Sequence, residues 1–420
     1  MGLIVQKFGG TSVADSEKIK NVANAVIKEK LNGNDVVVVV SAMGHTTDNL
    51  IKLSKEITHH PQEREMDMLM STGELISMSL LAMAINEKGY KAISLNGRQA
   101  GIQTENCHMC ARIVNIDTKR IKECLNNGYI VVVAGFQGYC DNNEITTLGR
   151  GGSDTTAVAL AGVLKAQRCD IYSDVEGVYT TDPRVVQTAQ KLKTISYEEM
   201  LELARVGANV LHPRSVETAK LYQIPMRVRS AFKLDDLGTL IIGVENMELN
   251  KPVTGLASDS SQIRIVICDV EDSPGNAAKL FDLLAGKNIS VDMIIQSYAR
   301  NMKKTNDIAF TISIDDYEKF NATKDEIMHI IKASNIFVDE DIVKVSIVGA
   351  GMIDRPGIAA KMFNTLAQED INIKMISTSE IKISCLIEKD CAQKATKALA
   401  KAFELDGAKV ADVKGDLPVL

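Results

Sequence analysis

Two hydrophobic periodicities alternate along the first half of the chain. Short apolar runs have the length and valine content of strands covered on both faces, and they occur at residues 3–8, 35–40, 92–95, 129–134 and 169–173. Segments with an apolar residue every three or four positions have the helical period, and they occur at residues 19–27, 47–57, 63–87 and 155–165. Strands that alternate with helices predict an α/β domain whose mostly parallel sheet is covered by helices on both faces.

Polar and glycine-rich segments follow several of the predicted strands. They are Lys7–Gly10, Ser41–Gly44, Phe136–Gly138 and Ser173–Asp174. In open parallel sheets, ligands bind beyond the carboxyl ends of the strands. The shared location of these segments therefore predicts one ligand site at that edge of the sheet.

The second half of the chain contains an internal repeat. Residues Ser273–Phe281 are echoed by Arg355–Phe363, and the same offset relates Met293 to Met375. Each copy has the pattern strand, Pro-Gly turn, helix, strand, strand, helix, strand, which is typical of a ferredoxin-like βαββαβ unit. A paired unit of this kind is either a small-molecule sensor or a dimerisation device, and the two roles are compatible.

These patterns predict three domains. We expect the α/β domain at residues 1–245, the first repeat unit at 246–340 and the second at 341–401. The last strand of the first unit is expected to come from residues 402–420. A chain of 420 residues is long enough for two or three domains.

Composition narrows the class of protein. The chain has 45% hydrophobic residues, 24% charged residues and a formal net charge of −6, which is typical of a soluble globular protein. No concentrated basic face indicates nucleic-acid binding. We expect no membrane span, because no apolar run approaches about 20 residues. Eight cysteines scattered through predicted strands and helices favour reduced thiols and a cytoplasmic location.

One short cysteine motif resembles half of a zinc site. Cys107-His108-Met109-Cys110 has ligand-like spacing, but no second pair of Cys or His residues with metal spacing follows it. We therefore expect no protein-bound metal.

The most distinctive stretch is the turn at residues 146–156, which precedes an alanine-rich helical segment. Its glycines allow close approach of a ligand and positive φ. The N–H groups at a helix start favour anions, and Arg150 adds a planar fork for a carboxylate or phosphate. The alternative is an ordinary capped turn, because Ser153 or Asp154 is a good helix cap.

Other polar residues extend this inventory. Lys7 precedes two glycines and is either a phosphate ligand or a solvated lysine. Glu74 lies in an apolar helical segment, so its carboxylate needs a partner, either a substrate amine or a structural Lys or Arg. In the polar loop 173–184, Tyr179 suits a nucleotide base and Arg184 its phosphates. Together these groups favour phosphoryl transfer to an amino acid.

Five ordered motifs carry a resemblance to a known family. They are Lys7–Ser12, Ser71–Glu74, Thr146–Thr156, Ser173–Arg184 and Leu211–Ser215. With them the chain resembles the aspartokinases over nearly its whole length. The resemblance implies an amino-acid-kinase three-layer sandwich followed by tandem ACT domains. It also implies transfer of the ATP γ-phosphate to the side-chain carboxylate of L-aspartate, giving 4-phospho-L-aspartate, with feedback inhibition through the ACT domains. This reaction is the first step of lysine, threonine and methionine synthesis.

The resemblance also assigns roles to individual residues. It implies catalytic roles for Lys7 and Asp154, substrate contacts from Ser41, Thr47, Glu74, Arg150, Gly151, Gly152 and Ser153, and ATP contacts from Lys7, Phe8, Gly9, Gly10, Ser173, Asp174, Tyr179, Asp182 and Arg184. Magnesium is expected to arrive with ATP. The attacking group is already a carboxylate, so no general base is required.

In the repeat, the resemblance implies that lysine, threonine or both bind as inhibitors. The matching positions are Asp272, Ser273, Pro274, Gly275, Asn276, Ala277, Ser290, Val291, Asp292 and Gln296 in the first unit, and Asn372, Ile373, Thr378 and Ser379 in the second. Aspartokinases of this plan form homo-oligomers through these units. Met247 is either the internal start of a shorter regulatory subunit or an ordinary linker methionine.

Two alternatives belong to other function classes. A kinase of the same fold acting on glutamate, a carbamate or a nucleoside monophosphate usually lacks the paired units and this Ser-Thr-Gly-Glu segment. A non-catalytic amino-acid sensor is disfavoured, because Lys7, Glu74, Arg150 and Asp154 are all present.

Overall fold

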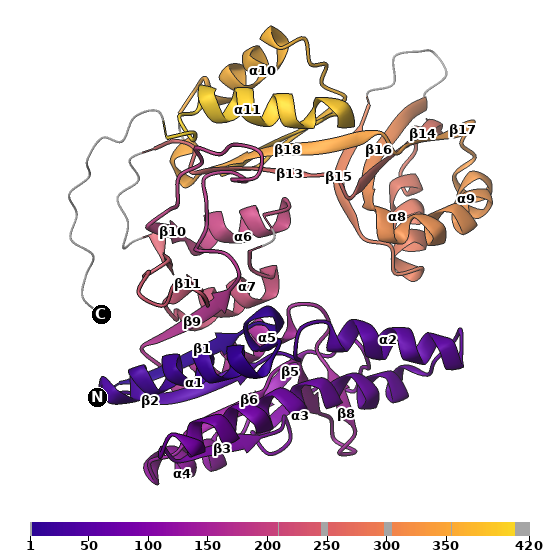
Figure 1. The fold of residues 1–420 in the computed structure, drawn as a ribbon. Coiled ribbons are helices and arrows are strands. Elements are labelled where there is room, and N and C mark those ends of the chain that lie inside the picture. The colour runs from indigo at the N-terminus through magenta and orange to yellow at the C-terminus, as the bar shows by residue number, and fades with distance from the viewer. Residues whose placement is uncertain (1, 209, 245–250, 298–304, 354, 408–420) are drawn as a thin grey trace.

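The computed structural model describes residues 2–208, 210–244, 251–297, 305–353 and 355–407. Figure 1 shows an N-terminal α/β domain, indigo to pink, and two orange-to-yellow repeat units above it. Helices α6 (Tyr197–Arg205) and α7 (Pro213–Tyr222) belong to the α/β domain and lie on the side that faces the repeat units.

The α/β domain is built on one eight-stranded sheet with the order β10-β12-β11-β9-β1-β2-β6-β3. The paired neighbours run parallel except for β11 and β12. The strands are β1 (Leu3–Phe8), β2 (Asp35–Val40), β3 (Ala92–Leu95), β6 (Ile130–Ala134), β9 (Arg168–Ser173), β10 (Thr194–Ser196), β11 (Met226–Ser230) and β12 (Thr239–Ile242).

The valine run of β2 explains the layered architecture. Val37 and Val39 enter one hydrophobic core, whereas Val36 and Val38 enter the core on the opposite face. Successive strand residues point to opposite faces, so an unbroken valine run must be covered twice. Helices α1 (Ser16–Leu31) and α3 (Glu63–Glu87) cover one face, with α2 (Thr46–Ile57) packed on α3, and α4 (Lys119–Asn126), α5 (Gly152–Leu164), α6 and α7 cover the other. The predicted fold class is confirmed.

A small second sheet leads into the glycine-rich turn. Its order is β5-β4-β7-β8, with β4 (Ile102–Thr104), β5 (Ile113–Ile116), β7 (Gln137–Tyr139) and β8 (Ile145–Thr147). Strand β8 packs against α3. The turn is therefore anchored between the small sheet and the longest helix of the domain.

Helix α3 bears on the expectation that the chain has no membrane span. It is long and apolar enough to cross a membrane by length and composition alone, and half of its most apolar stretch is buried inside the protein. Met78, Leu81 and Ile85 pack in the core on the sheet. Asp67 and Glu74 are also buried on this helix. Contact with the sheet accounts for the apolar residues on one face of α3, whereas Met68, Ile76, Leu80 and Met83 are exposed.

The repeat units form two four-stranded sheets. The first has the order β15-β16-β14-β17, from β14 (Gln262–Glu271), α8 (Asn276–Gly286), β15 (Val291–Gln296), β16 (Thr305–Ser313), α9 (Tyr317–Ile331) and β17 (Asn335–Asp339). The second has the order β13-β18-β20-β19, from β13 (Gly255–Asp259), β18 (Ile342–Val348), α10 (Ile358–Gln368), β19 (Met375–Thr378), β20 (Lys382–Glu388) and α11 (Ala392–Ala402). Short 3-10 turns occur at Gly10–Val13, Ile314–Asp316, Ala350–Met352 and Lys389–Cys391.

Pairing identifies the outer strand of each repeat sheet. In the described part of the chain the position beside β14 is held by β17, from residues 335–339, and the strand expected from residues 402–420 stays a prediction. The corresponding position beside β18 is held by β13, which precedes the first unit in sequence. The chain thus inserts the first unit between the outer strand of the second unit and the rest of that unit. Met247 and residues 408–420 lie outside the described residues.

The repeat is visible in the geometry of its glycines. Gly275 precedes α8 with φ +100°, and Gly357 precedes α10 with φ +97°. Glycine adopts this left-handed conformation without the steric cost other residues incur. Met293 and Met375, the pair related by the repeat offset, pack in one small core that also contains Ile342. The two sheets therefore contact each other within a single chain.

Candidate active site

The predicted ligand-binding segments meet at one edge of the main sheet. Strand β1 lies between β2 and β9, with Phe8 opposite Val40 on one side and Tyr172 on the other. The loops that follow these three parallel strands are therefore neighbours. Phe8 and Tyr172 stack with ring centroids 4.5 Å apart, which fixes the start of two of these loops.

The loop after β1 packs directly on the loop after β2. Gly44 N donates to Gly10 O over 3.0 Å. A Cβ atom on Gly10 would lie 2.8 Å from Ala42 O, closer than real Cβ contacts allow, so only glycine fits here. Gly9 N donates to Tyr172 O over 3.3 Å.

Lys7 and Asp154 form an ion pair at the centre of the site. Lys7 Nζ lies 2.6 Å from Asp154 Oδ1, and the two side chains are 12% and 13% exposed. Lys7 comes from β1 and Asp154 from the first turn of α5. The ion pair holds the ammonium group of Lys7 at the start of α5. The backbone dipoles at a helix start favour anionic groups, so an anion can bind beside this ammonium group.

The glycine-rich turn begins its helix earlier than the sequence predicts. Helix α5 begins at Gly152, and its cap is Gly151 with φ +71° and not Ser153 or Asp154. A Cβ atom on Gly151 would lie 2.3 Å from the Cβ atom of His212. The close approach of His212 and the left-handed backbone both require glycine, so the helix starts at the turn and not at Thr155.

Arg150 projects from this turn toward solvent. Its side chain is exposed, and it makes no ion pair with any residue in the described ranges. Ser41 directly follows β2 and Thr47 lies in the first turn of α2, and both residues are partly exposed. Ser153 is buried at the helix start. Arg150 therefore keeps its planar fork available for an anion.

Glu74 is the most unusual carboxylate of the site. It is 3% exposed, and Glu74 Oε1 accepts a hydrogen bond from Ala42 N over 3.0 Å. Glu74 Oε2 is buried and has no hydrogen-bond partner within the described part of the chain. Burial raises the pKa of Glu74 to about 8. Among the described residues no Lys or Arg forms an ion pair with Glu74, so the alternative of a structural ion pair is not supported.

The loop after β9 shows a different arrangement from the predicted one. Arg184 holds Asp182 with its guanidinium nitrogens at 2.8 to 3.1 Å, and its side chain is mostly exposed. Ser173 Oγ donates to Asp174 over 2.9 Å. The backbone of Tyr179 forms an isolated bridge with Lys191. A phosphate would therefore have to compete with Asp182 for the fork of Arg184.

Sequence patterns did not single out Asp67, which supports the turn from below. Asp67 is fully buried and accepts hydrogen bonds from Thr147 Oγ1 at 2.5 Å, His108 Nδ1 at 2.7 Å and Met109 N at 3.1 Å. Its spacing of seven residues from Glu74 places both carboxylates on the same face of α3. That spacing was the feature of the sequence that could have identified Asp67 beside Glu74.

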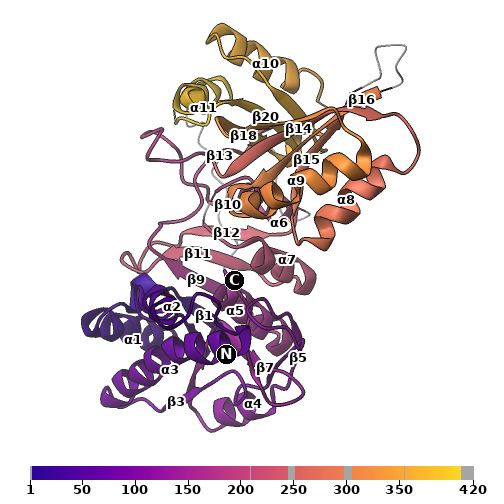
Figure 2. The same cartoon turned by 90° about the vertical axis from the view of Figure 1, so that its right-hand side faces the viewer.

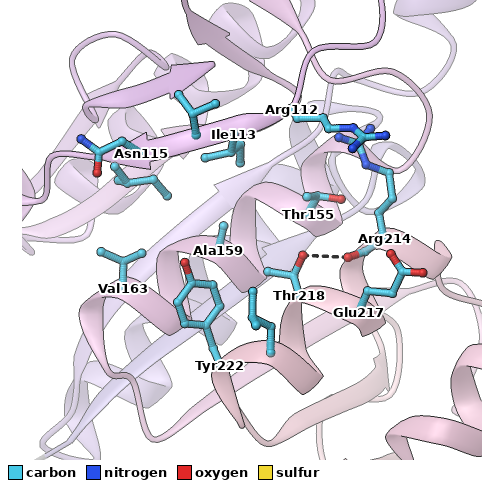
Figure 3. Close-up of a pocket in the computed structure, with 13 residues that line it drawn as sticks. Arg112, Ile113, Asn115, Thr155, Ala159, Val163, Arg214, Glu217, Thr218 and Tyr222 are labelled. Atoms are coloured by element: carbon cyan, nitrogen blue, oxygen red, sulfur yellow. Dashed lines mark hydrogen bonds between the residues drawn. The ribbon is translucent and has the colours of Figure 1, made fainter. Parts of the chain in front are cut away.

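Arg214 braces the same turn from the other side. It donates to Leu148 O over 2.7 Å and to Ala111 O over 3.1 Å. Figure 3 shows Arg214 and Arg112 at one end of a cavity of about 400 Å³, with Tyr222 toward its other end. This cavity lies between β5, α5 and α7, and its lining does not include Lys7 or Glu74. It is distinct from the candidate active site.

The predicted effector residues lie in two groups. Those of the first unit occupy the start of α8 and the edge strand β15, and those of the second lie in and beside the edge strand β19. Asn276 donates to Ser273 Oγ, and Asn306 donates to Asp272. Asp292 contacts Lys344 Nζ at 2.5 Å. Lys344 is buried in β18, so it ties the second unit to the first.

The comparisons agree with this geometry. A family model described as the amino acid kinase family matches residues 2–230, and one described as an ACT domain matches residues 345–403. The fold and site thus define a small-molecule kinase with a C-terminal ACT region.

Relatives narrow the class further. The aspartokinase of Bacillus sp. strain MGA3 is 55% identical over 410 residues, which cover 98% of this chain and 99% of that protein. Aspartokinase 2 of Bacillus subtilis is 53% identical over 405 residues, which cover 96% and 98%. The chain belongs to the aspartokinases of the amino acid kinase family.

Solved structures show the same fold. E. coli aspartokinase III in complex with aspartate and ADP matches with a TM-score of 0.82 at 27% identity, covering 96% of this chain and all of that one. The same enzyme in complex with lysine and aspartate matches with a TM-score of 0.74 at 28% identity, covering 96% and 99%.

Proposed function

We propose that this chain transfers the γ-phosphoryl group of Mg-ATP to the side-chain carboxylate of L-aspartate, with Lys7 and Asp154 at the reaction centre. The observation that carries the assignment is the ion pair of Lys7 with Asp154 in the first turn of α5, which follows directly on the turn that carries the exposed Arg150. The buried Glu74 Oε2, without a partner among the described residues, supports it. The product, 4-phospho-L-aspartate, leads to lysine, threonine and methionine.

Lys7 supplies the charge that phosphoryl transfer needs. Negative charge on the transferred group has to be stabilised by fixed positive groups, and magnesium bound to ATP contributes the remainder. Asp154 Oδ1 lies 2.6 Å from Lys7 Nζ and so holds this side chain at the start of α5. The aspartate carboxylate attacks directly, since it needs no proton removed.

Two charged side chains recognise the amino-acid end of the substrate. The free fork of Arg150 is suited to the α-carboxylate, which it can bind with two parallel hydrogen bonds. The unpartnered Glu74 Oε2 is suited to the α-ammonium. A buried acceptor without a partner is costly, so a ligand that supplies three N–H donors gains affinity there. Ser41, Thr47, Gly151, Gly152 and Ser153 complete the proposed substrate site.

The nucleotide is proposed to bind along the loops after β1 and β9. Phe8, Gly9 and Gly10 would lie beneath the phosphates, and Ser173, Asp174, Tyr179, Asp182 and Arg184 would line the remainder. The stacked pair Phe8 and Tyr172 supports this placement, because it sets both loops at the same edge.

Replacement of Arg150 tests substrate recognition. Arg150→Ala is expected to raise the KM for aspartate about 10- to 100-fold with little change in kcat, because hydrogen bonds to charged groups contribute about 1.5–3 kcal/mol. Arg150→Lys keeps the charge but loses the fork, so an intermediate KM is expected. Steady-state kinetics with aspartate varied at saturating ATP measures both. An unchanged KM in the alanine variant would contradict the assignment.

Glu199 connects the kinase domain to the regulatory units. It is 1% exposed, and its two oxygens accept from Ser196 in its own domain, from Thr254 Oγ1 at 2.6 Å and from Ala350 N at 2.9 Å. Thr254 precedes β13 and Ala350 follows β18. We propose that this contact couples effector binding to the active site, together with the 2.8 Å ion pair between Lys382 and Glu202.

Glu199→Gln tests that coupling. In this variant the amide N–H groups face the N–H and O–H donors of Ser196 or the N–H donor of Ala350, and at least one hydrogen bond is lost. Inhibition by lysine or threonine is therefore expected to weaken, and the free energy of unfolding is expected to fall by about 1–3 kcal/mol. Glu198→Gln is the matched control, because Glu198 pairs with Lys220 inside the kinase domain. The measurement is the effector concentration that halves the rate. Equal inhibition of both variants would rule out a role in coupling.

The exposed edges of the regulatory sheets support a homo-oligomer. Ile294 and Ile295 on β15 are 52% and 36% exposed, and Ile376 on β19 is 39% exposed. Unpaired apolar edge strands are ready templates for pairing with another chain. We expect light scattering after gel filtration to give at least twice the chain mass. A monomer at micromolar concentration would contradict this expectation.

The function itself is tested by ADP release from purified protein with Mg-ATP. Turnover with aspartate and not with glutamate is expected, and lysine, threonine or both should suppress it. Binding of ATP without turnover would favour a non-catalytic sensor. We expect the enzyme to work in the cytoplasm.

A further inference from the structure

The paired cysteines of the loop between β4 and β5 have no part in the proposed reaction. Cys107 Sγ and Cys110 Sγ lie 3.2 Å apart, and both residues are exposed. No group of three or more His, Cys, Asp or Glu side chains placed to hold a metal ion occurs in the ranges that the structure describes. The motif is an accessible pair of thiols in contact.

The two residues between these cysteines support the glycine-rich turn. His108 Nδ1 and Met109 N both contact the buried carboxylate of Asp67. The same carboxylate accepts from Thr147 Oγ1 at the end of β8. Asp67 thus links the backbone between the cysteines to Thr147 of the glycine-rich turn.

Backbone contacts make a second connection. Ala111 N, next to Cys110, donates to Thr147 O over 2.9 Å. Ala111 O and Leu148 O accept from the same guanidinium of Arg214. The carbonyl of Met109 also lies 3.1 Å from the position of a Cβ atom on Gly149. The cysteine loop and the turn that carries Arg150 are therefore packed as one unit.

We propose that Cys107 and Cys110 are a site of reversible oxidation, that a peroxide converts them to a disulfide, and that the disulfide weakens binding of the amino-acid substrate. The effect on substrate rests on the proposed function, whereas the oxidation itself does not. The sulfur atoms need to approach from 3.2 Å to the bond length of about 2.0 Å. That movement pulls on His108 and Met109, and through them on Asp67 and the turn.

The chemistry balances with hydrogen peroxide as the oxidant. One thiolate attacks a peroxide oxygen and becomes a sulfenic acid, and the second oxygen leaves as water after protonation. The other thiolate then attacks the sulfenic sulfur, the S–S bond forms, and a second water leaves. Two thiols and one peroxide give one disulfide and two waters. A dithiol reductant reverses the reaction by thiol–disulfide exchange.

The surroundings predict slow oxidation at neutral pH. The pKa of Cys107 is raised, first by its hydrogen bond to Cys110, then by burial and by the negative charges of Glu63 and Glu105. Only the thiolate reacts readily. Oxidation by a fixed dose of peroxide is therefore expected to proceed faster at mildly alkaline pH.

The sequence offers a clean readout of the oxidation. Trypsin releases residues 99–112 as one peptide that contains both cysteines and no other. After a peroxide pulse and alkylation of the full-length protein, the expected peptide carries no alkyl group and is lighter than the reduced form by two hydrogen atoms. Oxygen added to Met109 changes the mass in the other direction and is separately visible. A peptide that still takes up two alkyl groups would overturn the proposal.

Kinetics on the same samples tests the consequence. The KM for aspartate is expected to rise several-fold on oxidation and to recover with dithiothreitol. Cys107→Ser and Cys110→Ser are expected to keep the KM of the reduced enzyme after the same treatment, and Cys391→Ser, remote in the second repeat unit, to respond like the unmodified chain. A disulfide that leaves the KM unchanged would overturn the link to the turn. Loss of aspartate turnover in the reduced enzyme would instead contradict the proposed function and leave the peptide result standing.

Discussion

Lys7→Ala is expected to lower kcat by about 10³-fold while the KM for aspartate changes little, because removal of one fixed charge at a reaction centre typically costs about 10²–10³ in rate. Lys7 is the cation paired with Asp154 at the start of α5. Its loss leaves the transferred phosphoryl group without that charge and leaves Asp154 as an unpaired, partly buried anion that repels the phosphates. Both effects act on the transition state.

The control for this variant is Lys20→Ala. Lys20 is exposed on α1 and has no role in the proposed site, so full activity is expected. Asp154→Asn separates charge from orientation, since the amide keeps the shape but not the ion pair, and a smaller loss of kcat is expected. Rapid-quench measurement of ADP formation reports the chemical step directly. Near-normal turnover in Lys7→Ala would show that the lysine is not part of the reaction.

Glu74→Gln is expected to weaken aspartate binding by about 10²-fold, since loss of one partner from a buried charge pair typically costs about 2–5 kcal/mol. The amide retains the hydrogen bond acceptor for Ala42 N but offers no charge to the ammonium of the substrate. Isothermal titration with aspartate measures the loss. Gln and Glu have nearly the same shape, so a variant that binds normally would remove Glu74 from the site.

The raised pKa of Glu74 adds two tests that do not need turnover. Its value of about 8 exceeds the ordinary value of 4.5, so the free folded protein binds one more proton than the unfolded chain between these limits. The contribution of Glu74 to stability is therefore greatest at low pH and is lost as pH rises from about 4.5 to about 8. Glu74→Gln removes this loss and should be about 2–4 kcal/mol more stable than the unmodified chain above pH 8.

Aspartate binding should release this proton near pH 7, because the ammonium group favours the charged carboxylate. Titration in two buffers with different heats of ionisation detects the release. The unmodified protein is expected to release a proton when aspartate binds, and the Glu74→Gln variant is expected to release none. Equal apparent heats in both buffers would indicate that Glu74 is already ionised in the free protein.

The main elements of the fold followed from local patterns. The valine run of β2 required a sheet covered twice, and the structure divides it between two cores. The helical periods gave α2 and α3 at nearly the expected bounds, and α1 extends beyond its apolar segment 19–27 at both ends. The repeat predicted two similar units, and the matching left-handed glycines at 275 and 357 show that the similarity extends to the backbone.

The candidate site was predicted in part. The strand pattern placed Lys7 at the ligand-binding edge of the sheet, and the structure pairs it with Asp154 and sets Glu74 against Ala42 of the loop after β2. Local pattern did not reveal that Arg184 pairs with Asp182, because the choice between phosphate and carboxylate depends on which anion is within reach. Asp67 was missed because its partners, Thr147 and Met109, are distant in sequence.

The sequence by itself determined the strand and helix order, the repeat and the glycines that specify the turns, since these depend on side-chain period and on local backbone sterics. Only the tertiary structure decided that β13 pairs with β18 and completes the second regulatory unit. Several strands of the sequence could pair with the edge of β18, and packing between distant segments selects one of them. It also decided that Glu74 keeps one buried oxygen without a partner. Burial and pairing are set by residues distant in sequence, so the chemical state of that carboxylate emerges only when α3 is packed against the loop after β2.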